Sequence, residues 1–128
     1  MADRILIIED DPDVLESVSS LLTASGYVLL TATNGREGLQ KAQKERPDLL
    51  LTDLMLSQMN GYEVCTMLKQ DVRYQRIPVV IWSATKLGDI NVQIAKECGA
   101  DVFLLKTVDP KELLQTIQDL IAKSRQPQ

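Results

Sequence analysis

The chain has 128 residues, of which 45% are apolar, and its net charge is −4 at pH 7. This length suits one domain with a hydrophobic core, and the apolar fraction excludes disorder as the main state. The acidic balance and the lack of a basic stripe argue against a domain that binds nucleic acid. No apolar run is long enough to span a membrane.

A cytoplasmic protein is expected from two further features, the charged N-terminus and the use of cysteine. The N-terminal sequence MADRILIIEDD becomes charged before the apolar segment of a signal peptide could form. The only cysteines, Cys65 and Cys98, fit two buried thiols in a reducing compartment. The chain has no histidine, which excludes Ser-His and Cys-His nucleophiles and the usual zinc sites.

The first half of the chain alternates β-rich runs with segments of helical periodicity. Strands and helices are predicted in turn at 4–8, 11–26, 27–33, 34–45 and 48–53. Asp11 is a suitable N-cap and Pro12 a suitable first residue for the first helix. Asn34 and Glu37 have the spacing of a capping box at the start of the second helix.

The second half continues the same alternation. The predicted elements are a helix at 60–70, a strand at 78–83, a weaker helix that ends at Cys98, a strand at 102–106 and a last helix that begins at Asp109. Gly88 and Asn91 are poor helix formers, which makes the fourth helix the weakest prediction. Asn60 and Glu63 form another capping-box pair.

Five consecutive βα units predict an α/β fold, in which helices cover both faces of a parallel sheet. The strands lack polar alternation, as expected for strands that are buried on both faces. Residues 124–128 have the composition of a frayed tail or the start of a linker.

Four of the five predicted strands end in ionic or hydroxyl side chains, which are Glu9, Asp10 and Asp11, then Asp53, Ser83 and Lys106. Taken singly, these have ordinary explanations. Asp11 caps a helix, and Glu9 or Asp10 could be an exposed turn acid. Ser83 could be a satisfied hydroxyl or a helix cap, and Lys106 could be a surface lysine. Ligands of open α/β sheets bind beyond the carboxyl ends of the strands, so the combination predicts a site there.

The charges at this edge predict a divalent cation. Glu9, Asp10 and Asp53 would bring three carboxylates close together, and Lys106 offers one positive charge against them. A divalent ion would balance the remaining deficit of about two charges. Donor sets of oxygen alone select Mg²⁺, with Mn²⁺ as an alternative, and such an edge suits the binding of a phosphoryl group.

The segments ILIIEDDPDVL, LLLTDLMLSQMNGYEV, IPVVIWSAT and GADVFLLKT resemble the receiver domains of bacterial two-component response regulators. The resemblance covers nearly the whole chain and implies a receiver domain over residues 1–123. It also implies the flavodoxin-like, doubly wound fold of this family, with five helices and five parallel strands in the order 2-1-3-4-5.

The resemblance implies that Asp53 is the phosphoacceptor, which attacks a phosphohistidine of a histidine kinase or a histidine phosphotransfer protein. Asp53 and Asp10 would bind Mg²⁺ directly, Glu9 would bind it through water, and the backbone carbonyl of Met55 would be a further ligand. Gly61 matches the glycine in the loop after the phosphoacceptor.

Three residues match the switch machinery of the family. Ser83 and Lys106 would each contact a phosphoryl oxygen, and Phe103 would move inward as the Ser83 hydroxyl moves. Plain core packing is the alternative interpretation of Phe103.

This sequence departs from the family pattern at several positions. Ser57 and Thr107 stand where proline is common, so the bond between Lys106 and Thr107 could be cis or trans. Gln115 and Gln118 lie in the last helix, where the DNA-binding subfamily that dimerises through that face has arginines, which weakens a transcription-factor parent without excluding it.

The function implied is a phosphorylation-activated signalling switch rather than an enzyme, although it assists its own phosphorylation and slow autodephosphorylation. The face formed by helix 4, strand 5 and helix 5 would contact the downstream effector or output domain, and a homodimer is an option. A Mg²⁺-dependent phosphatase is disfavoured because Met55 stands where it would need a second acid. A degenerate scaffold is disfavoured because the acids and Lys106 are present.

Overall fold

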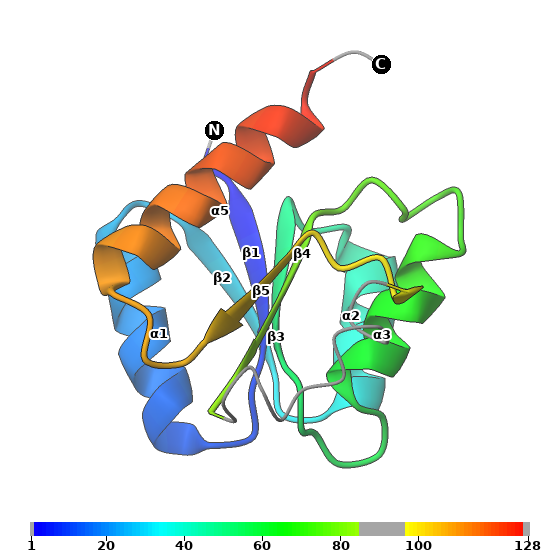
Figure 1. The fold of residues 1–128 in the computed structure, drawn as a ribbon, viewed down its shortest axis with the longest axis horizontal. Coiled ribbons are helices and arrows are strands. Elements are labelled where there is room, and N and C mark those ends of the chain that lie inside the picture. Colours follow the sequence, from blue (N-terminus) through cyan, green and yellow to red (C-terminus); the bar gives the residue numbers. More distant parts are fainter. Residues whose placement is uncertain (1, 85–96, 127–128) are drawn as a thin grey trace.

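The structure, a computed structural model, describes residues 2–84 and 97–126. Its elements are β1 (Arg4–Ile8), α1 (Pro12–Ala24), β2 (Val28–Ala32), α2 (Gly35–Glu45), β3 (Leu49–Asp53), α3 (Gly61–Lys69), β4 (Val79–Ser83), β5 (Val102–Leu105) and α5 (Pro110–Ser124). The strands form one parallel sheet in the order β2-β1-β3-β4-β5 (Figure 1). The predicted fold is therefore confirmed.

Local capping interactions start the helices close to the predicted positions. Asp11 accepts a hydrogen bond from the backbone N–H of Asp13 at the start of α1. The complete capping box predicted for α3 is present between Asn60 and Glu63. At α2, Asn34 caps the backbone N–H of Glu37, but the Glu37 carboxylate accepts from the N–H of Thr33 instead of the cap residue.

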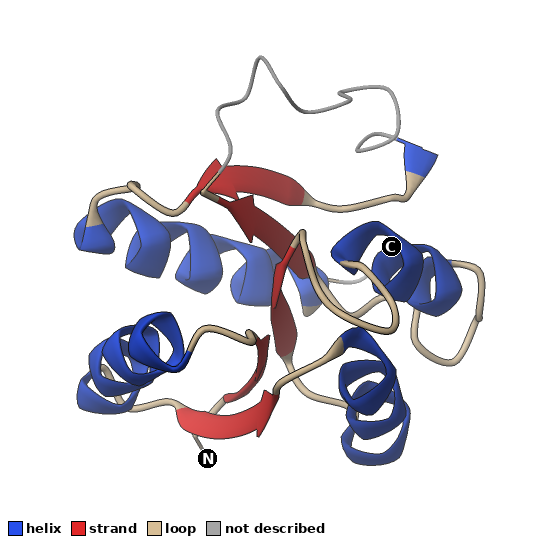
Figure 2. Cartoon of the chain, turned by 90° about the horizontal axis from the view of Figure 1, so that it is seen from below, coloured by secondary structure: helices blue, strands red, loops and turns tan. Residues whose placement is uncertain are grey.

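Two hydrophobic layers sandwich the sheet. α1 and α5 cover one face, and α2 and α3 cover the other (Figures 1 and 2). Successive residues of β1 serve the two layers alternately, because Ile5 and Ile7 pack with α1 and α5 whereas Leu6 and Ile8 pack with α2 and α3. β3 and β4 are buried along their whole length, as the absence of polar alternation predicted.

The described residues contain four of the five predicted helices. Most of the fourth, including Gly88 and Asn91, lies outside the described residues. Cys65 and Cys98 are both buried and form no disulfide, as predicted, and the Cys65 thiol donates a hydrogen bond to the Cys98 carbonyl over 3.3 Å. Among the described residues, none of the helices has the length and apolar character needed to cross a membrane.

Candidate functional site

The carboxyl ends of four strands bring the predicted site residues to one edge of the sheet. Asp53 is the last residue of β3 and Ser83 is the last residue of β4. Glu9 follows β1 directly, and Lys106 follows β5. The backbone N–H of Lys106 donates to the Ser83 carbonyl over 2.8 Å, which continues the β4–β5 ladder to this edge. Parallel pairing thus gathers side chains that are up to 97 positions apart.

An ionic network joins three of these residues. The Lys106 ammonium lies 2.7 Å from Glu9 Oε1, 3.1 Å from Glu9 Oε2 and 3.3 Å from Asp53 Oδ1. Glu9 is fully buried and Asp53 is 6% exposed. Burial of either carboxylate would be costly without a charged partner, so Lys106 is what makes both tolerable in the folded protein.

Asp10 completes an acidic cluster with Glu9 and Asp53. One carboxylate oxygen from each residue can be chosen so that all three lie within 4.8 Å of one another. Asp10 is exposed, whereas the other two are buried, so the cluster faces solvent on the Asp10 side. The donors are all oxygens, without histidine or cysteine, and this set fits Mg²⁺ or Mn²⁺.

Burial sets the protonation behaviour of the cluster. It raises the pKa of the Glu9 carboxyl to about 7, against the opposing hydrogen bond from Lys106. Burial likewise raises the pKa of Asp53, although the charge of Lys106 opposes that shift. Burial alone would lower the pKa of Lys106, but its hydrogen bond to Glu9 and its attraction to Asp53 raise it overall. The lysine therefore stays cationic at neutral pH.

The loop after β3 passes close to Asp53. The N–H of Gly61 donates to the Leu54 carbonyl over 2.9 Å, and a Cβ atom at Gly61 would lie 2.5 Å from the Asp53 carbonyl oxygen. Only glycine fits this approach without a shift of the backbone. Met55, whose carbonyl is the predicted further ligand, lies in the same loop with its side chain 68% exposed.

The bond between Lys106 and Thr107 is trans. With this trans bond the Lys106 ammonium still contacts the carboxylates of Glu9 and Asp53. The absence of the usual proline at position 107 therefore does not move Lys106 out of the site.

Phe103 lies in β5, on the face of the sheet that α2 and α3 cover. Its ring centroid is 6.3 Å from that of Tyr62, and it is only partly buried. Ser83 is almost fully buried at the end of β4. The two residues thus lie on neighbouring strands, but their motion on phosphorylation remains a prediction.

Trp82 also lies at the site, although no motif in the sequence gave it a role there. It pairs with Asp53 across β3 and β4, and the Lys106 ammonium lies 5.8 Å from its ring centroid. This is within the range of a cation–π contact. The ring therefore forms an apolar wall beside the lysine, and the signal in the sequence was its position directly before Ser83.

The family described as response regulator receiver domain matches residues 5–118. The chain belongs to this family. The receiver domain shares 39% identity over 122 residues with the DNA-binding dual master transcriptional regulator RpaA of Synechocystis, which covers 94% of this chain and 50% of that protein. It thus spans about half the length of the curated relatives it matches.

Solved structures of receiver domains share its fold. The signal receiver domain of a histidine kinase from Syntrophus aciditrophicus has a TM-score of 0.89 and 31% identity, with 99% of this chain and 96% of that chain covered. The receiver domain of the sensor kinase PA1611 from Pseudomonas aeruginosa has a TM-score of 0.87 and 23% identity, covering 95% of this chain and 99% of that one. The latter holds a magnesium ion in its active-site cleft. Membership of the family makes this chain a signalling domain of two-component systems rather than a classical enzyme.

Proposed function

We propose that this receiver domain accepts a phosphoryl group on Asp53 from a phosphohistidine of a histidine kinase or a histidine phosphotransfer protein. The observation that carries the proposal is that the Asp53 carboxylate lies 3.3 Å from the Lys106 ammonium and in one acidic cluster with Glu9 and Asp10. An Asp53 oxygen would attack phosphorus, and the bond from phosphorus to the histidine nitrogen would break. Carboxylates act as phosphoryl nucleophiles in this way.

Charge stabilisation is the main requirement of this step. When bound, Mg²⁺ would supply positive charge beside the phosphoryl oxygens, and Asp10, Asp53 and the Met55 carbonyl would hold it, with Glu9 acting through water. Lys106 and the Ser83 hydroxyl would each contact one phosphoryl oxygen. Lys106 is cationic and within reach of Asp53, so its contribution needs only a small movement.

The phosphorylated domain would then act as a switch. Reorientation of Ser83 and Phe103 would carry the change to the predicted face of helix 4, β5 and α5. That face would bind the downstream effector, an output domain or a second copy of the domain. The receiver, which we assign to residues 1–123, would not itself contact nucleic acid, and it would lose its phosphate by slow autodephosphorylation.

The direct test is phosphorylation by acetyl phosphate and Mg²⁺, followed by intact mass measurement. The parent should gain one phosphoryl group and retain it for long enough to be measured, whereas Asp53→Asn should gain none. Equal uptake by Asp53→Asn would place the phosphoacceptor elsewhere. Continuous turnover of acetyl phosphate without a retained group would favour a phosphatase, and no reaction in the parent would favour a scaffold.

A further inference from the structure

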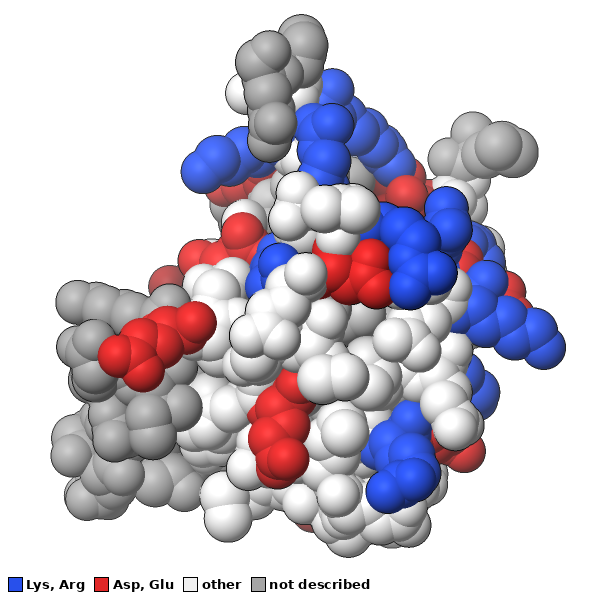
Figure 3. All heavy atoms as spheres, turned by 90° about the vertical axis from the view of Figure 1, so that its right-hand side faces the viewer, with Lys and Arg blue, Asp and Glu red and all other residues white. Residues whose placement is uncertain are grey.

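The side chains of Lys69 and Lys106 are largely buried, with 17% and 16% of each exposed. Figure 3 shows Lys and Arg side chains on one face of the molecule, many of which stand out into solvent. An ammonium group that is largely removed from water needs other partners. The partners of these two lysines therefore show how each one is held.

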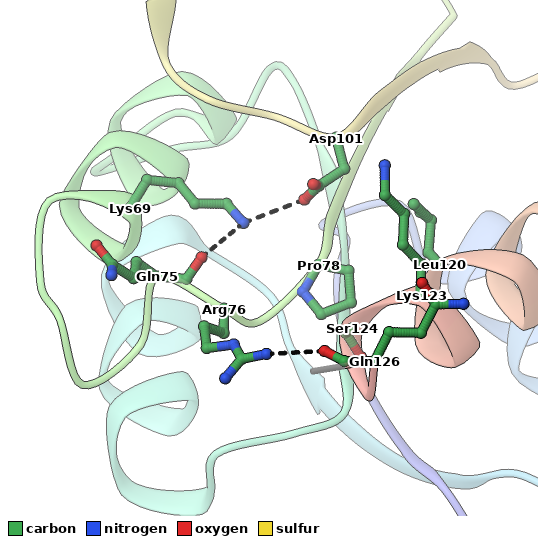
Figure 4. A pocket seen from close by; sticks show the side chains of 9 residues that line it. All are labelled: Lys69, Gln75, Arg76, Pro78, Asp101, Leu120, Lys123, Ser124 and Gln126. Atoms are coloured by element: carbon green, nitrogen blue, oxygen red, sulfur yellow. Dashed lines mark hydrogen bonds and ion pairs between the residues drawn. The ribbon is translucent and has the colours of Figure 1, made fainter. Parts of the chain in front are cut away.

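Lys69 is held by backbone carbonyls and by an anchored acid. Its ammonium donates to the carbonyls of Gln75 and Ile77 over 3.1 and 2.7 Å and lies 3.1 Å from the Asp101 carboxylate. Figure 4 shows Lys69 reaching toward Gln75 and Asp101, at the edge of the sheet where β4 and β5 begin. Asp101 is itself fixed, because it accepts from the backbone N–H of Val79 over 2.8 Å. These partners explain Lys69 as a structural lysine.

The contacts of Lys106 are of a different kind, because two of them are carboxylates of the proposed site. Its ammonium lies 2.7 Å from Glu9 Oε1 and 3.3 Å from Asp53 Oδ1, and it lies over the ring of Trp82 at 5.8 Å from the centroid. Binding of a metal ion or a phosphoryl group would change the charge around both carboxylates. The Trp82 ring is uncharged, so this contact keeps its character through both events.

The sheet fixes Trp82 beside the proposed phosphoacceptor. Trp82 stands opposite Asp53 in the register of β3 and β4. Paired residues of neighbouring parallel strands point to the same face of a sheet, so the two side chains share the face where Lys106 reaches both. Trp82 is only 5% exposed and packs in the hydrophobic layer of α1 and α5. It therefore gives the lysine a rigid surface.

The indole N–H of Trp82 argues against a role in hydrogen bonding. Its Nε1 atom is buried and has no hydrogen-bond partner among the described residues. A buried donor without a partner costs free energy, and an aliphatic side chain such as that of Val80, which lies in the same strand and the same layer, avoids this cost. A cation over an indole ring regains free energy, and the gain is larger where water is excluded. The contact with Lys106 thus accounts for a tryptophan at this position.

We propose that Trp82 is a positioning residue for phosphoryl transfer, an inference that rests on the proposed function. The face of its ring holds the Lys106 ammonium beside Asp53 while the charges of the surrounding carboxylates change. The lysine is then already in place for a phosphoryl oxygen when the group arrives. Trp82 acts through Lys106 and needs no contact of its own with the phosphoryl group.

The test compares the rates at which acetyl phosphate and Mg²⁺ phosphorylate the parent, Trp82→Leu and Trp82→Phe, measured by intact mass. Leucine keeps an apolar side chain but removes the π face, so the rate should fall at least about fivefold, which corresponds to about 1 kcal/mol. Phenylalanine supplies a π face without an N–H and should recover most of the rate. In a Lys106→Met background Trp82→Leu should cause no further slowing, because its effect passes through the lysine.

Ile117→Ala is the control for lost packing, because Ile117 is fully buried in the same layer. It should lower the urea midpoint, as the Trp82 variants do, and leave the phosphorylation rate close to that of the parent. A second measurement uses the parent in EDTA, without phosphorylation. By NMR, the ε-methylene protons of Lys106 should resonate upfield of those of Lys111, which is exposed, because of the ring current of Trp82.

An unchanged rate in Trp82→Leu, equal slowing in Trp82→Leu and Trp82→Phe, or slowing of the same size in Ile117→Ala would each overturn the proposal. So would further slowing in the Lys106→Met background, or ε-methylene resonances of Lys106 that match those of Lys111. Any of these results in a parent that is phosphorylated on Asp53 would overturn this inference alone. A parent that takes up no phosphoryl group would overturn the proposed function and this role of Trp82 together.

Discussion

Lys106 lies closer to Glu9 than to Asp53, with its ammonium 2.7 Å from Glu9 Oε1 and 3.3 Å from Asp53 Oδ1. The shortest hydrogen bond of Lys106 thus goes to Glu9, which is fully buried. Lys106 also remains in contact with Asp53, the proposed phosphoacceptor. A phosphoryl group on Asp53 would add negative charge beside the longer of the two contacts that Lys106 makes. We therefore expect that phosphorylation of Asp53 would draw Lys106 away from Glu9.

The pairing predicts strong coupling between the two residues. Lys106→Met should destabilise the metal-free protein by about 2–4 kcal/mol at pH 7.5, because it leaves the Glu9 carboxylate buried without a partner. Glu9→Gln introduced into that variant should restore most of the loss. Urea unfolding of the parent, both single variants and the double variant measures the coupling. Additive effects would show that the two residues do not depend on each other in the folded state.

The raised pKa values predict that metal-free protein loses stability as the pH rises. Glu9 has a folded-state pKa of about 7 against an ordinary value of 4.5, and the pKa of Asp53 is shifted in the same direction, both chiefly because of burial. At a pH between 4.5 and about 7, the Glu9 carboxyl binds more protons in the folded state than in the unfolded state. The free energy of unfolding therefore falls as the pH rises. The loss between pH 5 and pH 7.5 should be about 2 kcal/mol.

Urea unfolding in EDTA across this range checks the pH prediction, with Glu9→Gln as the matched variant. The neutral amide cannot titrate, so its stability curve should be flatter than that of the parent. A parent curve that rises with pH would contradict the assignment. Asp71, whose pKa is lowered to about 2 chiefly by its hydrogen bonds with Arg73, titrates below this window and does not interfere.

The acidic cluster predicts weak, saturable binding of Mg²⁺, since few protein ligands are available and water completes the shell. Trp82 is the only tryptophan and lies beside Lys106, so its fluorescence should report the rearrangement of charge. Asp10→Asn should abolish the saturable change. Asp13→Asn removes the same charge from the first turn of α1 and should leave it intact. If Asp10→Asn binds like the parent, the metal site lies elsewhere.

The close approach at Gly61 predicts a localised cost of adding one methyl group. Gly61→Ala would force the loop away from the Asp53 carbonyl and should destabilise the protein by about 1–3 kcal/mol, even though alanine favours helices. Phosphorylation by acetyl phosphate should slow in the same variant, because the shifted backbone includes Asp53. Met67→Ala, in an exposed position of the same helix, should change neither the urea midpoint nor the phosphorylation rate. A fully active Gly61→Ala would show that the loop adapts freely.

The local sequence by itself determined the elements and the edge at which the site forms. The cap residues Asp11 and Asn60 and the apolar runs of the strands act through interactions a few residues apart, so α1, α3 and all five strands could be predicted. The βα alternation was enough to place Asp53, Ser83 and Lys106 at one edge, because parallel strands end together. The strand order came from the family resemblance and not from these patterns.

Only the tertiary structure decided which groups pair and how deeply they are buried. The sequence left Glu9 open between an exposed turn acid and a site residue, whereas it is fully buried against Lys106, 97 positions away. The close approach that reserves position 61 for glycine could not be seen in the sequence either. The burial of a side chain and the close approach of two backbone segments depend on how elements that are distant in the sequence pack together. The residues next to it in the chain do not determine that packing.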